Sequence, residues 1–450
     1  MAESDLIEAG REHRNVVPLE AHAELSDDPN RPDPVDILVG QDETRLQQLV
    51  PIRHGRMRVT PFTFYRGAAA IMASDLSRTA TTDIRVQLCG DAHLSNFGIF
   101  RGPDRRLVFD VNDFDETASG PFEWDVKRLA ASVTIAGRNN EFTPKEIRRA
   151  TRASVRGYRE VLGETAHMSP LDVHYYRIEV ESLLAKAGKK RRKEMGKTVN
   201  KALRKDSVRA LNKLTTVVDG HRRIVPVPPV VTRADHLLEG EEREQVRDFF
   251  ARYLETLPPH RAAVLRQYRF VDMAHKIVGV GSVGTRCWIV LLESADGAPL
   301  FLQFKEATQS VLEPYAGATD YEQAGERVVR GQRLMQATGD LLLGWSRYHR
   351  DDHAIDFYFR QLWDGKGSTE VEDIGPNRLR NYAWHCGAAL ALAHARSGMA
   401  ATISGYLGDD KAVDRIFATF AERYADLNDL DYAAHDAAVK SGRILVVDAV

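Results

Sequence analysis

Residues 90–96 of the chain read Gly-Asp-Ala-His-Leu-Ser-Asn, and residues 109–113 read Phe-Asp-Val-Asn-Asp. The first stretch places Asn96 five positions after Asp91, and the second puts Asp110 at the end of a short apolar strand. In sites that transfer phosphoryl groups, an aspartate orients the attacking hydroxyl, an asparagine at this interval holds Mg²⁺, and a later aspartate holds the same metal. The spacing therefore predicts such a site, with Asp91 as the catalytic base or hydroxyl-orienting group, Asn96 as a metal ligand and Asp110 as the principal metal ligand.

The choice among the nearby acidic residues stays open at this stage. Asp113 and Asp115 belong to the same acidic segment as Asp110, and Asp113 is a second candidate metal ligand. Mg²⁺ prefers one or two carboxylates together with phosphate oxygens and waters, which this segment can supply. His93 either contacts phosphate or orders the loop. The competing interpretation is that these residues only cap turns and helices. The catalytic interpretation is favoured because two spacings, from Asp91 to Asn96 and from Asp91 to Asp110, both match such a site and both lie next to apolar strands.

A glycine-rich segment, Gly279-Val280-Gly281-Ser282-Val283-Gly284, lies far downstream. This pattern is either a dinucleotide-binding turn, which a helix must follow, or a loop between two strands that covers nucleotide phosphates. The residues that follow, 285–292, are rich in β-branched and aromatic side chains and favour a strand. We therefore expect a hairpin in which Gly279, Gly281, Ser282 and Gly284 cover the phosphates of ATP. A tight glycine hairpin without a ligand is the alternative.

Lys305 ends the next apolar strand, LFLQFK. A protein kinase places there the lysine that contacts the α- and β-phosphates and pairs with a glutamate on the following helix. Glu326 is the preferred partner, and Glu322, one turn away, is the rival. Gln361, after the strand DFYF, lies where the linker between kinase lobes would supply adenine-binding backbone groups.

Composition sets broader limits. The 450 residues are 43% hydrophobic and 28% charged, with a net charge of −2, which is ordinary for a soluble globular protein of two or three substructures. This charge gives no argument for nucleic acid as a partner, and no run of about 18 apolar residues suggests a membrane span. The polar, acidic N-terminus is unlike a signal peptide. Three widely spaced cysteines indicate neither a disulfide framework nor a zinc site, so a cytoplasmic location is expected.

The periodicity along the chain predicts an α+β protein with four regions. These are a partly irregular leader (1–50), a helical region with the catalytic loop and the metal-binding strand (51–270), a β-rich region with the glycine-rich loop (271–363) and C-terminal helices (364–450). The helical region includes a basic insert at 186–205, with ten Lys or Arg and one Glu. Such a run is either a solvated face or a polyanion-binding segment.

Six segments together resemble a known family. They are GDAHLSNFG, FDVNDFDE, GPFEWDVKRLA, RMRVTPFTFYRG, FLQFKEA and GERVVRGQRLMQ. The combination is similar to domain-of-unknown-function family 2252, an uncharacterised bacterial family grouped with the protein-kinase-like superfamily, near the aminoglycoside and choline phosphotransferases. In those relatives the loop reads HGDxHxxN, and Cys89 here replaces the first His. The resemblance implies a kinase-like two-lobe fold, ATP and Mg²⁺ as cofactors, and a structural role for Asp125 in tying the catalytic loop to the helix below.

The order of the motifs differs from that of an ordinary kinase. The glycine-rich loop and Lys305 follow the catalytic loop, and the helix that ends in LALAHARSG, which normally runs straight into that loop, lies near the C-terminus. This order predicts a circular permutation in which the catalytic segment of the C-lobe precedes the β-rich N-lobe. Permutation is tolerated when chain termini lie at the surface.

The sequence thus favours an ATP- and Mg²⁺-dependent phosphotransferase that acts on a hydroxyl group. A small-molecule acceptor is expected because only 13 residues separate Asp110 from the next predicted helix at Glu123, too few for an activation loop. Two alternatives remain: AMP transfer to a protein on the same fold, and a non-catalytic module that binds a nucleotide or a partner through the basic insert. The sequence carries no signature of the acceptor or of an oligomeric state.

Overall fold

The computed structural model describes residues 2–186, 207–233, 240–350, 353–362 and 367–447, together with residues 188, 192, 196 and 199. Most of the basic insert at 186–205 lies outside this set, so its role stays a prediction. The described residues form a mixed α+β structure, as the sequence predicts. None of their helices combines the length and apolar character needed to cross a bilayer.

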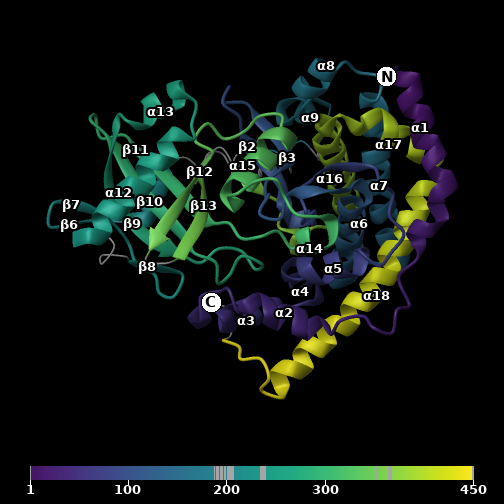
Figure 1. Ribbon diagram of the computed structural model, residues 1–450, viewed down its shortest axis with the longest axis horizontal. Helices are drawn as coiled ribbons and strands as arrows, with labels where there is room; N and C mark the ends of the chain where they lie inside the picture. The colour runs from purple at the N-terminus through teal and green to yellow at the C-terminus, as the bar shows by residue number, and fades with distance from the viewer. Residues whose placement is uncertain are drawn as a thin grey trace.

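Helices dominate both ends of the chain. They are α1 Glu3–Val16, α2 Pro34–Asp42, α3 Val50–Met57, α4 Pro61–Gly67, α5 Ala69–Leu76, α6 Phe122–Asn139, α7 Pro144–Thr165, α8 Pro170–Tyr175, α9 Val180–Lys186, α11 Ser207–Leu214, α12 Gly240–Glu255, α13 Pro259–Leu265, α14 Glu313–Ala316, α15 Ala324–Met335, α16 Pro376–His394, α17 Ala400–Leu407 and α18 Ala412–Lys440. The leader is therefore more helical than predicted, and α1 packs against α17 (Figure 1).

In the part of the chain that the structure describes, the strands form four antiparallel sheets. They are β1 Arg85–Leu88, β2 Phe97–Arg101, β3 Leu107–Val111, β4 Ala118–Pro121, β5 Ile178–Glu179, β6 Thr215–Val218, β7 His221–Ile224, β8 Val231–Arg233, β9 Tyr268–Lys276, β10 Cys287–Ser294, β11 Pro299–Glu306, β12 Gly344–Arg350, β13 His353–Gln361 and β14 Gly367–Ser368. The largest sheet has the order β12-β13-β11-β10-β9-β8, and a second has the order β14-β2-β3-β5. Strand β1 pairs with β4, and β6 with β7.

The six-stranded sheet is covered on both faces. On one face, Phe249 and Tyr253 of α12 pack against Phe304 and Phe359 of the sheet. On the other face, Leu211 of α11 packs against a smaller cluster of buried sheet residues. A β-rich part thus lies at the left of Figure 1, and the long helices α6, α7, α16 and α18 lie at the right.

Helices α7 and α16 approach each other closely through glycine. A Cβ added at Gly387 of α16 would lie 1.9 Å from the Ser154 carbonyl oxygen, and one at Gly157 of α7 would lie 2.2 Å from that of Trp384. Both distances are far below a van der Waals contact, so only glycine allows this approach. The close pair fixes the position of α16, whose C-terminal end reaches the catalytic loop.

Replacing Gly387 with Ala is expected to lower the free energy of unfolding by about 1–3 kcal/mol, because the two helices must move apart. Urea denaturation measures the change. Gly163→Ala in α7 is the matched control, since an added Cβ there meets only Ser404 Oγ at 3.8 Å. A helix interior favours Ala over Gly by about 0.5–1 kcal/mol, so the control should be neutral or stabilising. Equal destabilisation by both variants would contradict the packing described here.

Candidate active site

The predicted catalytic loop connects β1 to β2 and is held by its own backbone. The Asp91 carbonyl oxygen accepts hydrogen bonds from the His93 N–H and from Asn96 Nδ2, both at 2.8 Å. Gly90 has φ +84, and a Cβ there would lie 2.1 Å from the Glu116 carbonyl oxygen. Because the amide nitrogen of Asn96 is used within the loop, its Oδ1 is the atom left to serve as a metal ligand.

Asp125, near the start of α6, ties this loop to the helix below it, as predicted. Its carboxylate accepts hydrogen bonds from the backbone N–H groups of Cys89 at 2.8 Å and Gly90 at 3.1 Å. His394 Nε2, at the end of α16, lies 3.1 Å from the same carboxylate. All of these groups are buried. The start of the catalytic loop is therefore fixed by two helices that lie far apart in the sequence.

The Asp91 side chain is held by a buried arginine. Arg128, one turn after Asp125 on α6, brings Nη2 to 2.7 Å from Asp91 Oδ1 and donates from Nε at 2.8 Å. Burial alone would raise the pKa of Asp91, but the charges of Arg128 and, to a smaller extent, Arg66 outweigh it and hold the pKa below its ordinary value. Asp91 is therefore a carboxylate at neutral pH, able to accept a hydrogen bond from a hydroxyl group.

His93 lies next to Asp91 as a neutral imidazole. Its Nε2 is 3.6 Å from Asp91 Oδ2, and its buried Nδ1 has no hydrogen-bond partner among the described residues. Burial lowers the pKa of His93 to about 3, against the opposing charge of Asp91. The side chain therefore cannot act as a cation toward phosphate, although a neutral ring can still donate or accept one hydrogen bond.

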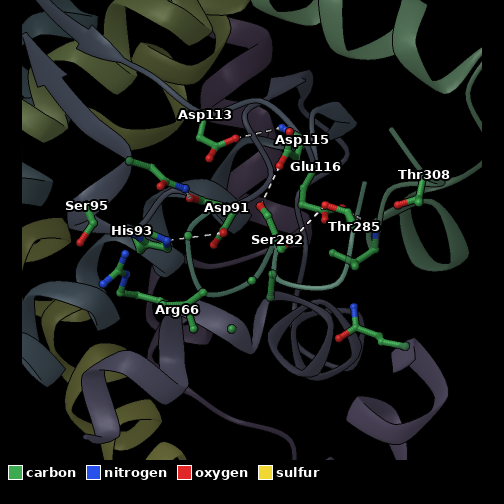
Figure 2. A pocket seen from close by; sticks show the side chains of 18 of the residues that line it. Arg66, Asp91, His93, Ser95, Asp113, Asp115, Glu116, Ser282, Thr285 and Thr308 are labelled. Carbon is green, nitrogen blue, oxygen red and sulfur yellow. Dashed lines mark hydrogen bonds and ion pairs between the residues drawn. The ribbon is translucent and has the colours of Figure 1, made fainter. Parts of the chain in front are cut away.

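Of the candidate metal ligands, the structure brings Asp113 to the site and leaves Asp110 out. Asp110 Oδ1 accepts from the Val111 N–H at 2.9 Å and Oδ2 from the Ala337 N–H at 3.4 Å, and the residue is not among those that line the cavity of Asp91. Asp113 follows β3 by two residues and lines the same cavity as Asp91 and Asn96 (Figure 2). Burial, then repulsion from Asp115, raises the pKa of Asp113. A cation bound there would relieve both effects.

Lys305 pairs with Asp115 and not with Glu326. Its Nζ contacts Asp115 Oδ2 and donates to Ser282 Oγ at 2.7 Å, while the Tyr358 hydroxyl donates to Asp115 Oδ1 at 2.7 Å. Burial opposes the lysine charge, but Asp115 outweighs it and raises the pKa of Lys305. The lysine is thus a buried cation joined to both the acidic segment and the glycine-rich loop.

The glutamates predicted as its partner face elsewhere. Glu326 forms an ion pair with Arg330 at 3.2 Å on the outer face of α15, and Glu322 precedes that helix. The inner face of α15 presents Arg327 instead. Arg327 donates to the carbonyl oxygens of Thr117 at 2.5 Å and Asp115 at 2.8 Å. The helix therefore clamps the backbone of the acidic segment with an arginine and leaves Lys305 to pair with a side chain of that segment.

The glycine-rich segment forms the predicted hairpin turn between β9 and β10, with Gly279 at φ +70 and Gly284 at φ +94. Gly279, Gly281 and Ser282 line the cavity. Two arginines of the N-terminal part hold the turn in place. Arg45 donates to the Val283 carbonyl at 2.6 Å, and Arg56 donates to that of Gly279 at 2.7 Å. The loop therefore lines the cavity together with Asp91 and Asp113, and Arg45 and Arg56, which lie outside the sheet, hold it there.

Gln361 lies apart from these residues. Its backbone N–H donates to Asp340 Oδ2 at 2.5 Å, and it lines a separate cavity of about 90 Å³. The neighbouring Arg360 donates from Nε to Gln303 Oε1 at 2.8 Å, and its electrostatic interactions with Tyr358, Asp113 and Asp115 outweigh its burial and raise its pKa. The structure thus gives no support to Gln361 as an adenine contact, because its backbone donor is already used.

The central cavity has a volume of about 270 Å³. Its lining includes the predicted residues Asp91, His93, Asn96, Asp113, Gly279, Gly281 and Ser282. The described residues contain no group of three or more His, Cys, Asp or Glu side chains that could hold a metal unaided. Mg²⁺ would fit with Asp113 and Asn96 as protein ligands and with phosphate oxygens and waters as the others.

The sequence did not point to three residues around the cavity, Arg66, Arg128 and Arg327, nor to the pairing of Asp115 with Lys305. Arg128 had a readable signal, because it lies one helical turn after Asp125 and therefore shares its face. Arg327 is the residue directly after the predicted Glu326. In α15 the side chain of Arg327 faces inward, and that of Glu326 faces outward. Arg66 carried no signal beyond its place in the segment PFTFYRG.

A family model described as "Uncharacterized protein conserved in bacteria (DUF2252)" matches residues 45–438 of the chain. The matched range contains Asp91, Asn96, Asp113 and Lys305. No curated protein and no solved structure gives a significant match.

Proposed function

The chain belongs to the DUF2252 family of proteins conserved in bacteria, and we propose that it is an ATP- and Mg²⁺-dependent phosphotransferase acting on a hydroxyl of a small-molecule acceptor. One observation supports this proposal most. A carboxylate that can orient a hydroxyl, Asp91, shares a cavity of about 270 Å³ with an unpaired carboxylate, Asp113, and with a glycine-rich turn bonded to a buried lysine. These parts come from opposite halves of the sequence.

Each residue has a role that follows from its surroundings. Asp91 accepts the proton of the acceptor hydroxyl as that oxygen forms a bond to the γ-phosphorus, and the bond from the γ-phosphorus to the bridging oxygen of ADP breaks. Mg²⁺ would neutralise charge on the phosphate oxygens, and Asp113 with Asn96 would hold it. The backbone of Gly279–Ser282 and the cation of Lys305 would face the phosphates. Catalysis of this kind is mainly positioning and charge stabilisation.

We infer a circularly permuted kinase-like arrangement of two lobes for the same reasons. The six-stranded sheet and its glycine-rich turn lie on one side of the cavity, and the catalytic loop with α6 lies on the other. The segment directly after α16, Ala395–Met399, lies beside β1, since the Gln87 N–H donates to Ser397 Oγ at 3.0 Å. In space, therefore, α16 leads into the catalytic loop as the helix before that loop does in a kinase, although the chain order is reversed.

The pairing of Lys305 gives a direct prediction for stability. Asp115→Asn is expected to lower the free energy of unfolding by about 2–3 kcal/mol, because the loss of one partner leaves a buried charge uncompensated. Asp115 keeps 24% of its side chain exposed, which places the effect below the range for fully buried pairs. Glu326→Gln, which breaks an ion pair with a half-exposed arginine, should cost under about 1 kcal/mol. If urea denaturation showed a larger loss of unfolding free energy for Glu326→Gln than for Asp115→Asn, Asp115 would not be the partner of Lys305.

Labelled ATP tests the reaction. We expect the purified protein with Mg²⁺ to release label from γ-labelled ATP and to leave the α-label in ADP. Label transferred from α-labelled ATP to protein would show AMP transfer instead. ATP that stays intact, together with salt-sensitive polyanion binding that survives Asp91→Asn, would indicate the non-catalytic module.

A further inference from the structure

Arg66, at the end of α4, is a cation without a partner among the described residues. It lines the central cavity, and its Nε is buried with no hydrogen-bond acceptor. No described residue forms a hydrogen bond or ion pair with its guanidinium. Arg66 is partly buried, an unsatisfied buried donor such as its Nε is costly, and burial lowers the pKa of the side chain. Such a group persists where a ligand supplies the missing acceptors.

The other charged groups that line the cavity are already engaged, with one exception. The engaged groups are Asp91 with Arg128, Asp115 with Lys305, Glu306 with Arg286, Glu116 with the Val311 N–H, and Arg45 with the Val283 carbonyl. The exception is Asp113, which has no ion pair among the described residues and suits a cation. Arg66 is thus the lining cation that is left to receive an anion.

The position of Arg66 assigns it to the acceptor side of the cavity. The charges that act on its pKa, after burial, are those of Glu372 and Asp91, and it in turn influences His93 and Asp91. Figure 2 shows Arg66, His93 and Ser95 on one side of Asp91, and Asp115, Glu116 and Ser282 on the other. The groups proposed to face the phosphates, Ser282 and the Lys305 bonded to it, belong to the second side.

We propose that the acceptor carries an anionic group, a carboxylate or a phosphate monoester, which Arg66 binds while the acceptor hydroxyl meets Asp91. This inference rests on the proposed phosphotransferase function. The planar guanidinium matches either oxyanion with two parallel N–H···O bonds. Asp91, already neutralised by Arg128, adds little repulsion toward such an anion. The neutral ring of His93, with Nδ1 free among the described residues, offers one further hydrogen bond beside it.

Calorimetry on the full chain saturated with Mg·AMPPNP tests this site, because the nucleotide then fills its own phosphate positions. Inorganic phosphate and acetate are the two probes, and they distinguish a phosphate monoester from a carboxylate. At least one should bind, and Arg66→Met should weaken it by about 10- to 100-fold, the range for charge-assisted hydrogen bonds. Choline is the cationic probe and should not bind. Arg11→Met, which removes an exposed arginine of α1, is the charge-matched control and should bind as the wild type does.

The outcomes separate the two proposals. Equal anion binding by wild type and Arg66→Met, no binding of either anion, or binding of choline alone would overturn the anionic acceptor. Anion binding that disappears once Mg·AMPPNP is bound would assign Arg66 to the nucleotide and would also overturn it. Failure of AMPPNP to bind, with Arg66-dependent phosphate binding intact, would sink the phosphotransferase and leave the anion site standing. If Arg66→Met melts early, Arg66→Lys, which keeps the charge but loses the fork, should show an intermediate affinity.

Discussion

Replacing Asp91 with Asn is expected to lower the rate of Mg·ATP turnover by about 10²- to 10⁴-fold, the range for loss of a positioned acid–base group. Asparagine keeps the shape of the side chain and can still accept the hydrogen bond from Arg128, which lies 2.7 Å away in the wild type. It cannot take the proton of an attacking hydroxyl or water. The affinity for Mg·AMPPNP should therefore change little. Release of labelled phosphate gives the rate, and calorimetry gives the affinity.

Ser95→Ala is the matched control for this variant, because Ser95 lies on the same loop and lines the same cavity. It should retain most of the turnover. An Asp91→Asn protein that hydrolyses ATP as fast as the wild type would mean that the measured turnover does not arise at this site, and the catalytic interpretation of the loop would be wrong.

The second large effect is expected at Asp113. Asp113→Asn should raise the Mg²⁺ concentration needed for half-maximal turnover. It should also reduce the rate at saturating Mg²⁺ by at least about 10²-fold, because the metal stabilises the charge of the transition state by several kcal/mol. The carboxylate is the stronger of the two protein ligands proposed, since Asn96 offers only a neutral oxygen. A Mg²⁺ titration of turnover at fixed ATP measures both changes.

Asp110→Asn serves as the control for Asp113→Asn and decides between the two aspartates. The Asp110 carboxylate accepts two backbone N–H groups outside the cavity, and asparagine can keep one of these hydrogen bonds. We expect a normal Mg²⁺ dependence with some loss of stability. If Asp110→Asn abolished the Mg²⁺ dependence and Asp113→Asn did not, the metal site would have to be moved to Asp110.

The spacing of residues within short segments predicted those parts of the site that are formed within a single loop or turn. The interval between Asp91 and Asn96 is set by one loop, and the hairpin nature of 279–284 follows from the β-branched residues after it. The tie between Asp125 and the catalytic loop was read through the resemblance to phosphotransferases. These features depend on short segments, so sequence reasoning could reach them.

Side-chain pairs between distant segments could not be predicted from the sequence. Lys305 pairs with Asp115, which lies 190 positions earlier. Whether the lysine pairs with Asp115 or with Glu326 depends on the rotation of α15 about its axis, which no local sequence pattern determines. The same holds for Asp110, since strand β3 alternates its side chains and only the neighbours decide which face meets the cavity. The unpaired state of Arg66 is a property of the whole surrounding shell and has no signature in a single sequence.

The central claim is that one nucleotide joins Asp91, Asp113 and Lys305, and a calorimetric titration of Mg·AMPPNP into the wild type and the Lys305→Met variant tests it most directly. We predict saturable binding that requires Mg²⁺ and weakens by at least about 10-fold in Lys305→Met, because the cation proposed to face the phosphates is lost. A wild type that does not bind Mg·AMPPNP, or a folded Lys305→Met variant that binds it with unchanged affinity, would contradict the account.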